Sequence, residues 1–369
     1  MIPPTLRVDV VDPSAFTPPY DRSLSAALAR AGADVRLVTS RFAYGDVTPA
    51  EGYAVDERFY RAAPGAPGSR LRLAAKLAQH VPDMLRYRRA ARDADVVHFQ
   101  WLAVQPVDPW LLPRDRPLVL TAHDVLPREP RPGQLRAQRR LYDRVDAVVV
   151  HSHHGRERLV VDLGVDPERV HVIPHGAFDH LAALPDEPLP PELAGVDGPV
   201  VLFFGLLRPY KGVDVLLEAW RGIGGAELWV VGMPRMPLRE LRSRAAPSVR
   251  FFPRFVPDGQ VAALFRRADL VVLPYREIDQ SGVLATALAF GKPLLLSAVG
   301  GFPEVAEAGA AELVAPGDAP ALHLALRRLL GDAPRREALS AAAREAAATR
   351  WSWDTVAARH MELYRGLVA

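Results

Sequence analysis

Short apolar runs rich in Val, Leu and Phe alternate with amphipathic stretches along the whole chain. Such runs are typical of parallel strands buried on both faces, and the stretches between them predict covering helices. In the first half the predicted strands are 6–11, 34–40, 95–101, 117–123, 147–152 and 170–175. In the second half they are 199–205, 226–232, 249–253, 270–275, 293–299 and 311–316. The pattern predicts an α/β protein with doubly wound parallel sheets.

One stretch, residues 176–198, interrupts this pattern because it is rich in Pro, Asp and Gly and has no clear period. A chain of 369 residues has room for about two domains. We therefore expect two Rossmann-like domains, 1–176 and 199–352, joined by a linker over 177–198. Ligands of such sheets bind at the carboxyl ends of the strands, so we expect a central cleft that both domains face.

Charge, cysteine content and apolar run length together exclude several classes of protein. The formal net charge of +3 is too small a surplus to suggest the basic surface of a nucleic-acid-binding protein. The lack of cysteine excludes disulfides and cysteine catalysis. The N-terminus shows no signal-peptide pattern, and no apolar run approaches the ~18–20 residues that span a bilayer. We expect a cytoplasmic protein, soluble or peripheral at the inner face of the membrane.

Residues 70–92 form a basic amphipathic segment that we expect to be broken at Pro82. One interpretation is docking onto an anionic membrane surface. The other is a solvated surface helix, and the abundance of arginine throughout the chain favours it.

The segment GLLRPYKG, residues 205–212, is predicted to be a tight loop between a strand and a helix. Lys211 in this loop is one of three lysines, against a combined Lys and Arg count of 46. Gly205 lets the backbone approach a ligand, and the first N–H groups of the helix favour anions. Together with Arg208, these features predict a diphosphate site without a metal. The alternative is two solvated loop cations.

A second loop, REIDQSG, follows the strand that ends near Tyr275, and Asp279 or Ser281 can cap the helix behind it. A third loop, VGGFPE, opens a short helix at Glu304. Free amides at such helix starts suit a hydroxyl-rich or anionic ligand. The predicted binding residues here are Gln280, Ser281, Gly282, Val283 and Glu304. Three loops at strand ends of one domain favour a ligand site over ordinary capping.

These motifs, in this order, resemble the retaining glycosyltransferases of family four (glycosyl transferases group 1), which have the GT-B fold. The matching stretches are FFGLLRPYKGVDVLLEAW, ADLVVLPY, SGVLATALAFGKPLLLSAVGGFPEV, VHVIPHG, WSWDTVAARHMELY and TAHDVLPRE. The resemblance spans nearly the whole chain. It implies that 199–352 binds a nucleotide-sugar donor and that 1–176 binds the acceptor. It also implies a final helix, 353–369, that crosses back onto the first domain, and no essential metal.

Carried over by position, the resemblance assigns Arg208 and Lys211 to the donor diphosphate and His123 of TAHD to the reacting face of the donor sugar. The family often has an arginine directly after the first glycine of this loop. Leu206 occupies that position here, so Arg208 supplies the guanidinium. For His98, which lies inside a strand, we favour a structural role.

The chain departs from the family at its Glu-x7-Glu pattern. The second glutamate is replaced by Thr286, which offers the donor ribose only a hydroxyl. The position of the first glutamate is occupied by Ile278, which lies between Glu277 and Asp279. Either of these two neighbours can supply the carboxylate that contacts the donor sugar. The Gly-rich turn that many relatives have after the first strand is also absent. The segment TPPYDRS stands there, and we expect its Tyr20 and Asp21 to face the acceptor.

The sequence therefore predicts a hexosyltransferase-type glycosyltransferase of class EC 2.4. It would move a sugar from a UDP- or GDP-linked donor, a co-substrate and not a cofactor, to an acceptor hydroxyl with retention. Polysaccharide, lipid-linked glycan and natural product remain as acceptor classes. The alternatives are a sugar-nucleotide epimerase or hydrolase on the same fold, and a non-catalytic nucleotide-sugar-binding protein. A dinucleotide-dependent oxidoreductase is disfavoured because no G-x-G-x-x-G turn follows the first strand.

Overall fold

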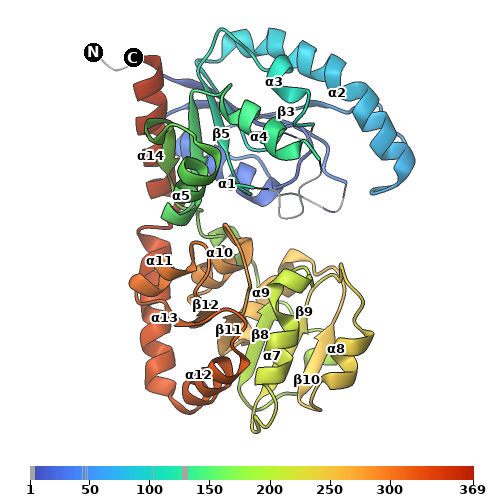
Figure 1. Cartoon of the computed structure of the whole chain (residues 1–369), viewed down its shortest axis with the longest axis vertical. Helices are drawn as coiled ribbons and strands as arrows, with labels where there is room; N and C mark the ends of the chain where they lie inside the picture. The colour runs from blue at the N-terminus through green and yellow to red at the C-terminus, as the bar shows by residue number, and fades with distance from the viewer. Residues whose placement is uncertain (1–4, 44, 46, 48, 103, 127–131) are drawn as a thin grey trace. The chain divides into compact units, whose positions relative to one another are not determined.

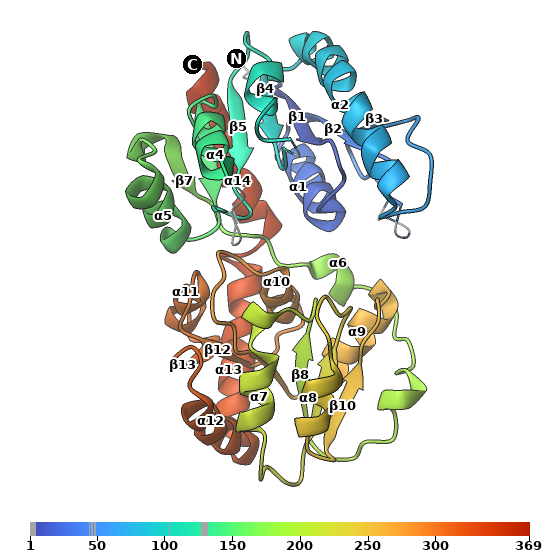
Figure 2. The same ribbon diagram turned by 45° about the vertical axis from the view of Figure 1, so that its right-hand side comes forward.

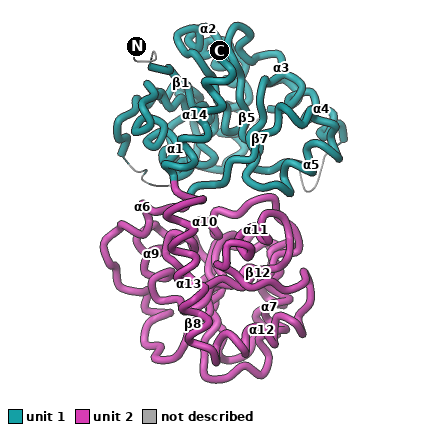
Figure 3. The backbone as a smooth tube through the Cα atoms, turned by 90° about the vertical axis from the view of Figure 1, so that its left-hand side faces the viewer, with its two compact units in different colours: residues 1–176, 353–369 teal, residues 177–352 magenta. Residues whose placement is uncertain are grey.

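Two compact units make up the chain, and Figure 3 colours them separately. Unit 1 is Met1–Gly176 with Trp353–Ala369, and unit 2 is Ala177–Ser352. The structure, a computed structural model, describes residues 5–43, 45, 47, 49–102, 104–126 and 132–369. Each unit holds one parallel sheet with helices on both faces (Figures 1 and 2).

Unit 1 is built on a seven-stranded sheet in the order β3-β2-β1-β4-β5-β6-β7. Its strands are β1 (Arg7–Asp12), β2 (Asp34–Ser40), β3 (Ala54–Phe59), β4 (Val96–Phe99), β5 (Leu118–Thr121), β6 (Ala147–Val150) and β7 (Val170–Val172). The strand order reverses between β1 and β4. Doubly wound folds bind their ligands at the carboxyl ends of the strands beside such a reversal.

The helices of unit 1 come from the first half of the sequence and from its C-terminal end. They are α1 (Pro18–Arg30), α2 (Arg70–Ala90), α3 (Asp108–Leu111), α4 (Gln134–Tyr142), α5 (His153–Leu163) and the C-terminal α14 (Trp353–Val368), with 3-10 turns at Ala91–Asp93 and Pro167–Arg169. The C-terminal helix packs on α1, where Arg30 and Asp354 form an ion pair at 2.8 Å.

Unit 2 has a six-stranded sheet in the order β10-β9-β8-β11-β12-β13, which reverses between β8 and β11. Its strands are β8 (Val200–Phe204), β9 (Glu227–Val231), β10 (Val249–Phe252), β11 (Leu270–Leu273), β12 (Leu294–Ser297) and β13 (Ala311–Val314). Its helices are α6 (Asp179–Ala182), α7 (Val213–Ala219), α8 (Arg239–Arg244), α9 (Asp258–Arg267), α10 (Gly282–Ala289), α11 (Phe302–Glu307), α12 (Ala319–Gly331) and α13 (Ala333–Ala348), with 3-10 turns at Pro191–Leu193 and Pro209–Lys211.

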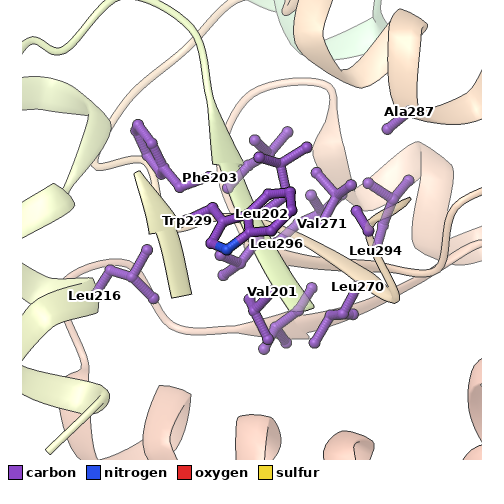
Figure 4. Close-up of a cluster of buried hydrophobic side chains, with 14 of the residues drawn as sticks. Val201, Leu202, Phe203, Leu216, Trp229, Leu270, Val271, Ala287, Leu294 and Leu296 are labelled. Carbon is purple, nitrogen blue, oxygen red and sulfur yellow. The ribbon is translucent and has the colours of Figure 1, made fainter. Parts of the chain in front are cut away.

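The core of unit 2 lies around its central strands (Figure 4). Val201 and Phe203 of β8, Leu270 of β11 and Leu294 of β12 are fully buried, and the indole of Trp229 fills the space beside them. Burying apolar area of this kind contributes about 25 cal/mol per Å². The continuous apolar runs of the sequence are therefore strands covered on both faces.

Two local features differ from the sequence-based expectation. The edge strand β3 was not expected, because its sequence AVDERF has no continuous apolar run. Helix α2 runs unbroken through Pro82, so the predicted break is wrong. A proline inside a helix costs about 3 kcal/mol, but contacts on both sides of it hold α2 in place. His80 bonds Asp108 at 2.5 Å, and Asp83 accepts the backbone N–H of the residue after β3 at 2.8 Å.

Residues 177–198, expected to be a linker, belong to unit 2 by their contacts, and α6 within them packs on α9 and α10. Across the described part of the chain, no helix combines the length and the apolarity needed to cross a membrane.

Candidate active site

The loop GLLRPYKG leaves the carboxyl end of β8, beside the reversal of strand order in unit 2. Gly205 has a φ of +113°, and a Cβ atom there would lie 2.9 Å from Lys211 Nζ and 3.0 Å from Val283. Any larger residue would displace both side chains. Lys211 is only 7% exposed. Its ammonium donates to Tyr275 Oη at 3.0 Å and lies 4.8 Å from the centre of that ring. The predicted residues Gly205, Lys211 and Val283 therefore meet at one point.

A second set of contacts fixes this loop to the loop after β11. The Arg276 guanidinium pairs with Asp214 at 2.6 Å and donates to the Pro209 carbonyl at 2.8 Å. The Arg276 backbone N–H donates to the Tyr210 carbonyl at 2.8 Å. The hydrogen bond from Arg276 also lowers the pKa of Asp214. Arg208 itself is exposed, so the loop holds its lysine inside and presents its arginine to solvent.

The loop REIDQSG separates its two candidate carboxylates. Glu277 is exposed, whereas Asp279 is 5% exposed. Ser281, one of the two predicted caps, is the N-cap of α10, and its hydroxyl accepts the Leu284 N–H at 3.4 Å. Gln280 is half-buried, and its Oε1 atom is buried without a partner among the described residues. Asp279 is therefore the desolvated one of the two candidates, and charge interactions are stronger in such a position.

Two further predicted donor residues, Thr286 and Glu304, already have partners within unit 2. Thr286 is 5% exposed, and its hydroxyl donates to the Gly282 carbonyl at 2.9 Å. This is the bond that helical threonines commonly make to the preceding turn. Glu304, in the first turn of α11, forms an ion pair with Arg350. A ligand at either residue would have to share or displace these bonds.

In unit 1, four successive strands are followed by polar side chains, namely Gln100, His123, His151 and His175. His123 is 2% exposed. Its Nδ1 lies 3.2 Å from His151 Nε2, its Nε2 lies 3.3 Å from Gln100 Oε1, and its ring stacks on Trp101 with centroids 5.0 Å apart. Burial lowers the pKa of His123 well below its usual range, that of His151 to about 4 and that of His175 to about 3. These imidazoles are therefore neutral at pH 7.

We call Gln100, His123, His151 and His175 the histidine row. The hydrogen positions in the histidine row follow from the carbonyl group of Ile173. Its carbonyl lies 3.0 Å from His151 Nδ1 and can only accept. A neutral His151 therefore carries its hydrogen on Nδ1 and accepts the His123 Nδ1–H at its Nε2. The Nε2 of His123 is then an acceptor, so we assign the Gln100 amide with its NH₂ group, in place of Oε1, toward the ring. The row holds His123 in one tautomer and one orientation.

The two predicted acceptor residues are buried, with Tyr20 at 1% and Asp21 at 2% exposure. The Tyr20 ring packs edge-on against His123, with centroids 4.8 Å apart. Asp21 accepts from the Thr17 hydroxyl at 3.3 Å. Burial, and then the charge of Asp12, raise the pKa of Asp21 well above its usual value. Tyr20 thus packs against the histidine row, and Asp21 bonds the turn after β1 through Thr17.

The turn after β1 presents an aromatic side chain that the sequence analysis did not single out. The Asp12 carboxylate accepts the backbone N–H groups of Ser14, Phe16 and Thr17 at 3.1, 2.5 and 3.2 Å. These bonds hold Ala15 at a φ of 51°, a conformation that costs about 1–2 kcal/mol. Phe16 is 59% exposed, and its ring lies 5.4 Å from Trp101.

Comparison with known proteins decides the family. The family profile "Glycosyl transferases group 1" matches residues 198–332, and "Glycosyltransferase Family 4" matches residues 22–177. The D-inositol 3-phosphate glycosyltransferase of Xylanimonas cellulosilytica is 30% identical over 94% of this chain and 90% of its own length. The chain belongs to glycosyltransferase family 4.

Solved structures show the fold. Sucrose-phosphate synthase from Thermosynechococcus elongatus superposes with a TM-score of 0.76 at 22% identity, covering 98% of this chain and 99% of that one. The Anabaena protein Alr3699/HepE, in complex with UDP-glucose, superposes with a TM-score of 0.74 at 20% identity, covering 98% and 100%. The predicted family and GT-B fold are confirmed. This family 4 protein is a glycosyltransferase of class EC 2.4 that uses nucleotide-sugar donors.

The family 4 motifs predicted only some of the residues that shape the candidate site. Tyr275 and Arg276, which anchor the GLLRPYKG loop, were not predicted, and their position directly after a strand was the only signal. Trp101 and Phe16 were missed because the sequence does not show that they contact each other, 85 positions apart. Residues 127–129 of the TAHDVLPRE stretch lie outside the described residues.

Proposed function

We propose that this enzyme transfers a hexosyl group from a UDP-linked sugar to an acceptor hydroxyl, with retention of configuration and without an essential metal. The observation that carries the proposal is the ammonium of Lys211, held at the carboxyl end of β8 by Tyr275 and Gly205. Nucleotides bind at this position in doubly wound sheets. We favour UDP over GDP because the similarly folded HepE protein was solved with UDP-glucose.

On the donor side, Lys211, Arg208 and the amides of residues 281–283 would stabilise the charge that develops on the leaving diphosphate. Preorganised groups of this kind often supply the largest part of catalysis. The leaving oxygen would take the proton of the acceptor hydroxyl on the same face of the sugar. Retention follows, and no separate general base is needed. Asp279 would contact the donor sugar in place of the first family glutamate.

On the acceptor side, we propose that unit 1 binds a ring-containing acceptor against Phe16 and Trp101, beside His123. The exposed Phe16 ring and the half-buried Trp101 ring offer an apolar surface, and the Asp12 bonds hold the turn that carries Phe16. The neutral His123 would contribute hydrogen bonding and packing at the reacting face. Tyr20 and Asp21 would not contact the acceptor and would instead hold His123 and the turn after β1 in position.

The transfer is tested by incubating the chain with labelled UDP-glucose or a GDP-linked hexose, with and without acceptors. D-inositol 3-phosphate, named in the relatives' activity, is the first acceptor to include. Label in a glycosylated acceptor supports the proposal. Donor consumed equally without acceptor indicates an epimerase or hydrolase. Tight donor binding without turnover indicates a non-catalytic binding protein.

The metal-independent part is tested by chelation. The proposed diphosphate site relies on a lysine, an arginine and backbone amides, so we expect activity to survive excess EDTA. Loss of activity on chelation, with rescue by Mg²⁺ or Mn²⁺, contradicts this part.

The acceptor surface is tested by Phe16→Ala. Removing one stacking ring should raise the acceptor KM by about tenfold and leave the donor KM within twofold, because aromatic pairs contribute about 0.5–1.5 kcal/mol. Leu324→Ala is the matched control, since Leu324 is a 67% exposed apolar residue on α12 of unit 2. An unchanged acceptor KM in Phe16→Ala removes this surface from the site.

A further inference from the structure

Helix α2 turns a row of apolar side chains to solvent, while its buried face holds two polar side chains, His80 and Asp83, beside Met84 and Tyr87. Leu73, Leu77, Val81 and Leu85 recur every fourth residue and therefore form one ridge. They are 60%, 53%, 39% and 41% exposed. Leu71, at the start of the helix, is 63% exposed. An ordinary surface helix buries its apolar stripe and exposes its polar face, so the ridge needs another explanation.

The inward polar side chains fix this orientation. His80 bonds the Tyr60 hydroxyl through Nδ1 at 2.7 Å and Asp108 through Nε2 at 2.5 Å. Asp83 accepts the Tyr60 backbone N–H at 2.8 Å. Rotating α2 to bury its leucines would break these buried bonds and leave charged groups without partners. Buried hydrogen bonds of unit 1 therefore fix the ridge in its outward orientation. Figure 1 shows α2 along the outer side of this unit.

A cationic pocket continues the ridge at its C-terminal end. It measures about 240 Å³ and contains Leu85 of the ridge, one carboxylate, Asp115, and five arginines. The arginines are Arg88, Arg89, Arg92, Arg114 and Arg116. Arg116 donates to the Arg92 carbonyl at 2.7 Å, and its Nε is buried without a partner among the described residues. Such a pocket suits a phosphate group.

The charge pattern indicates what covers this surface. Asp83 is the only acidic residue of α2; it faces inward and pairs with Arg86 at 2.6 Å. The outward side of α2 therefore carries apolar side chains and cations but no acidic side chain. An apolar face bordered by arginines is typical of helices that lie in the interface of an anionic membrane.

We propose that α2 docks this enzyme on an anionic phospholipid bilayer, with the Leu73–Leu85 ridge at the level of the upper acyl chains and a lipid phosphate in the arginine pocket. The helix lies on the membrane and does not cross it. This inference does not depend on the proposed donor or acceptor.

The experiment is co-sedimentation of the full chain with vesicles, without donor or acceptor. The probes are vesicles of phosphatidylcholine alone and of phosphatidylcholine mixed with phosphatidylglycerol. We expect binding to the mixed vesicles only, weakening as salt is raised. Leu73→Ser with Leu77→Ser should reduce binding by about tenfold or more. Arg88→Gln with Arg92→Gln should also reduce it and flatten the salt dependence.

The control replaces Val161 and Leu324 with serine, because both are at least as exposed as the ridge residues, at 72% and 67%. It should bind as the wild type does. All variants change exposed side chains except at Arg88, which is half-buried. Thermal unfolding checks that every variant stays folded. No binding to mixed vesicles, or equal loss in the control, overturns the proposal.

Two further results would also overturn it and name another occupant. A dimer in size-exclusion chromatography that the leucine variants dissociate would assign the ridge to a second copy of the chain. Stabilisation by inorganic phosphate, lost in the arginine variants and without vesicle binding, would assign the pocket to a free phosphate compound.

Discussion

Lysine is rare in this chain, and none of its three lysines is exposed. Lys76 lies 5.0 Å from the centre of the Tyr60 ring, and Lys292 donates to the Arg266 carbonyl at 2.9 Å. Burial lowers the pKa of both. The structure also contradicts the alternative that Lys211 is a solvated loop cation. Lysine thus remains where a compact ammonium fits between packed groups and a longer, planar guanidinium does not.

The tight fit of the Lys211 ammonium predicts the behaviour of two variants. Lys211→Met keeps the length of the side chain and should lower kcat by roughly a hundredfold, about 2.7–4 kcal/mol by analogy with losing one oxyanion donor. Lys211→Arg should also be impaired, because Gly205 and Val283 leave little room beside the ammonium. Steady-state kinetics at saturating acceptor measure both effects, and thermal unfolding checks the fold. Full activity in Lys211→Arg would mean that the loop needs only a charge.

Thr286 gives a second prediction at the level of the residue. Because its hydroxyl already donates to the Gly282 carbonyl, we expect Thr286→Ala to change the donor KM by less than about twofold. A hydroxyl that held the ribose would contribute about 1 kcal/mol, so its loss would raise the donor KM five- to tenfold. Donor titration at fixed acceptor distinguishes the two results.

At the scale of elements, glycines let the loops of unit 2 pack backbone against backbone. Gly212, which precedes α7, has a φ of +67°, and a Cβ there would lie 2.0 Å from the Pro274 carbonyl oxygen after β11. Gly300, which precedes α11, has a φ of +55°, and its Cβ would lie 1.8 Å from the Ile278 carbonyl oxygen. These two contacts join the loops after β8, β11 and β12, which carry the predicted donor residues.

A matched pair of variants tests this packing. Gly212→Ala combines left-handed strain with a backbone clash. Gly222→Ala has the same strain, with φ of +75°, but nothing within 4 Å of the new atom. Each should lose about 1 kcal/mol of unfolding free energy to strain, and Gly212→Ala should lose at least ~2 kcal/mol more. Denaturant unfolding measures the difference. Equal losses would mean that the loops are not held by this contact.

At the scale of the whole molecule, unit 1 carries a group of buried neutral histidines. Burial lowers the pKa of His98 and His123 well below the usual range, of His151 and His360 to about 4 and of His175 to about 3. Polar contacts hold them, as where His98 bonds the Tyr364 hydroxyl at 2.6 Å and Thr121 Oγ1 at 2.7 Å. The Nε2 atom of His360 is buried without a partner among the described residues. The group links the strand ends of the sheet to α14.

The group predicts how stability depends on pH. In the unfolded chain each histidine is protonated below about pH 6.5, whereas in the folded chain it stays neutral to about pH 4 or lower. The stability that depends on these neutral histidines is therefore complete above pH 6.5 and is lost as the pH falls toward 4. We expect a melting temperature at least about 5 °C lower at pH 5 than at pH 7. His360→Leu, which removes one proton-binding group, should reduce this difference, and equal melting temperatures at both pH values would contradict the account.

The sequence by itself determined the class of fold and the family. Each segment predicted as a strand contains one, because strand burial depends on a short local run of apolar residues. The GLLRPYKG loop and the cap at Ser281 were predictable for the same reason, since turn and cap chemistry is local in sequence. The identity of the enzyme class followed from the order of these motifs.

The tertiary structure alone decided which side chains are buried and what they touch. Tyr20 and Asp21 lie beneath the surface, while Phe16 beside them is exposed, because packing from α14 and the strand ends covers one side of the turn. The burial of Lys211 depends on Tyr275, which is 64 residues away. The outward ridge of α2 depends on His80 and its partner from α3. Contacts between residues so distant in sequence leave no periodic signal, so only the folded chain reveals them.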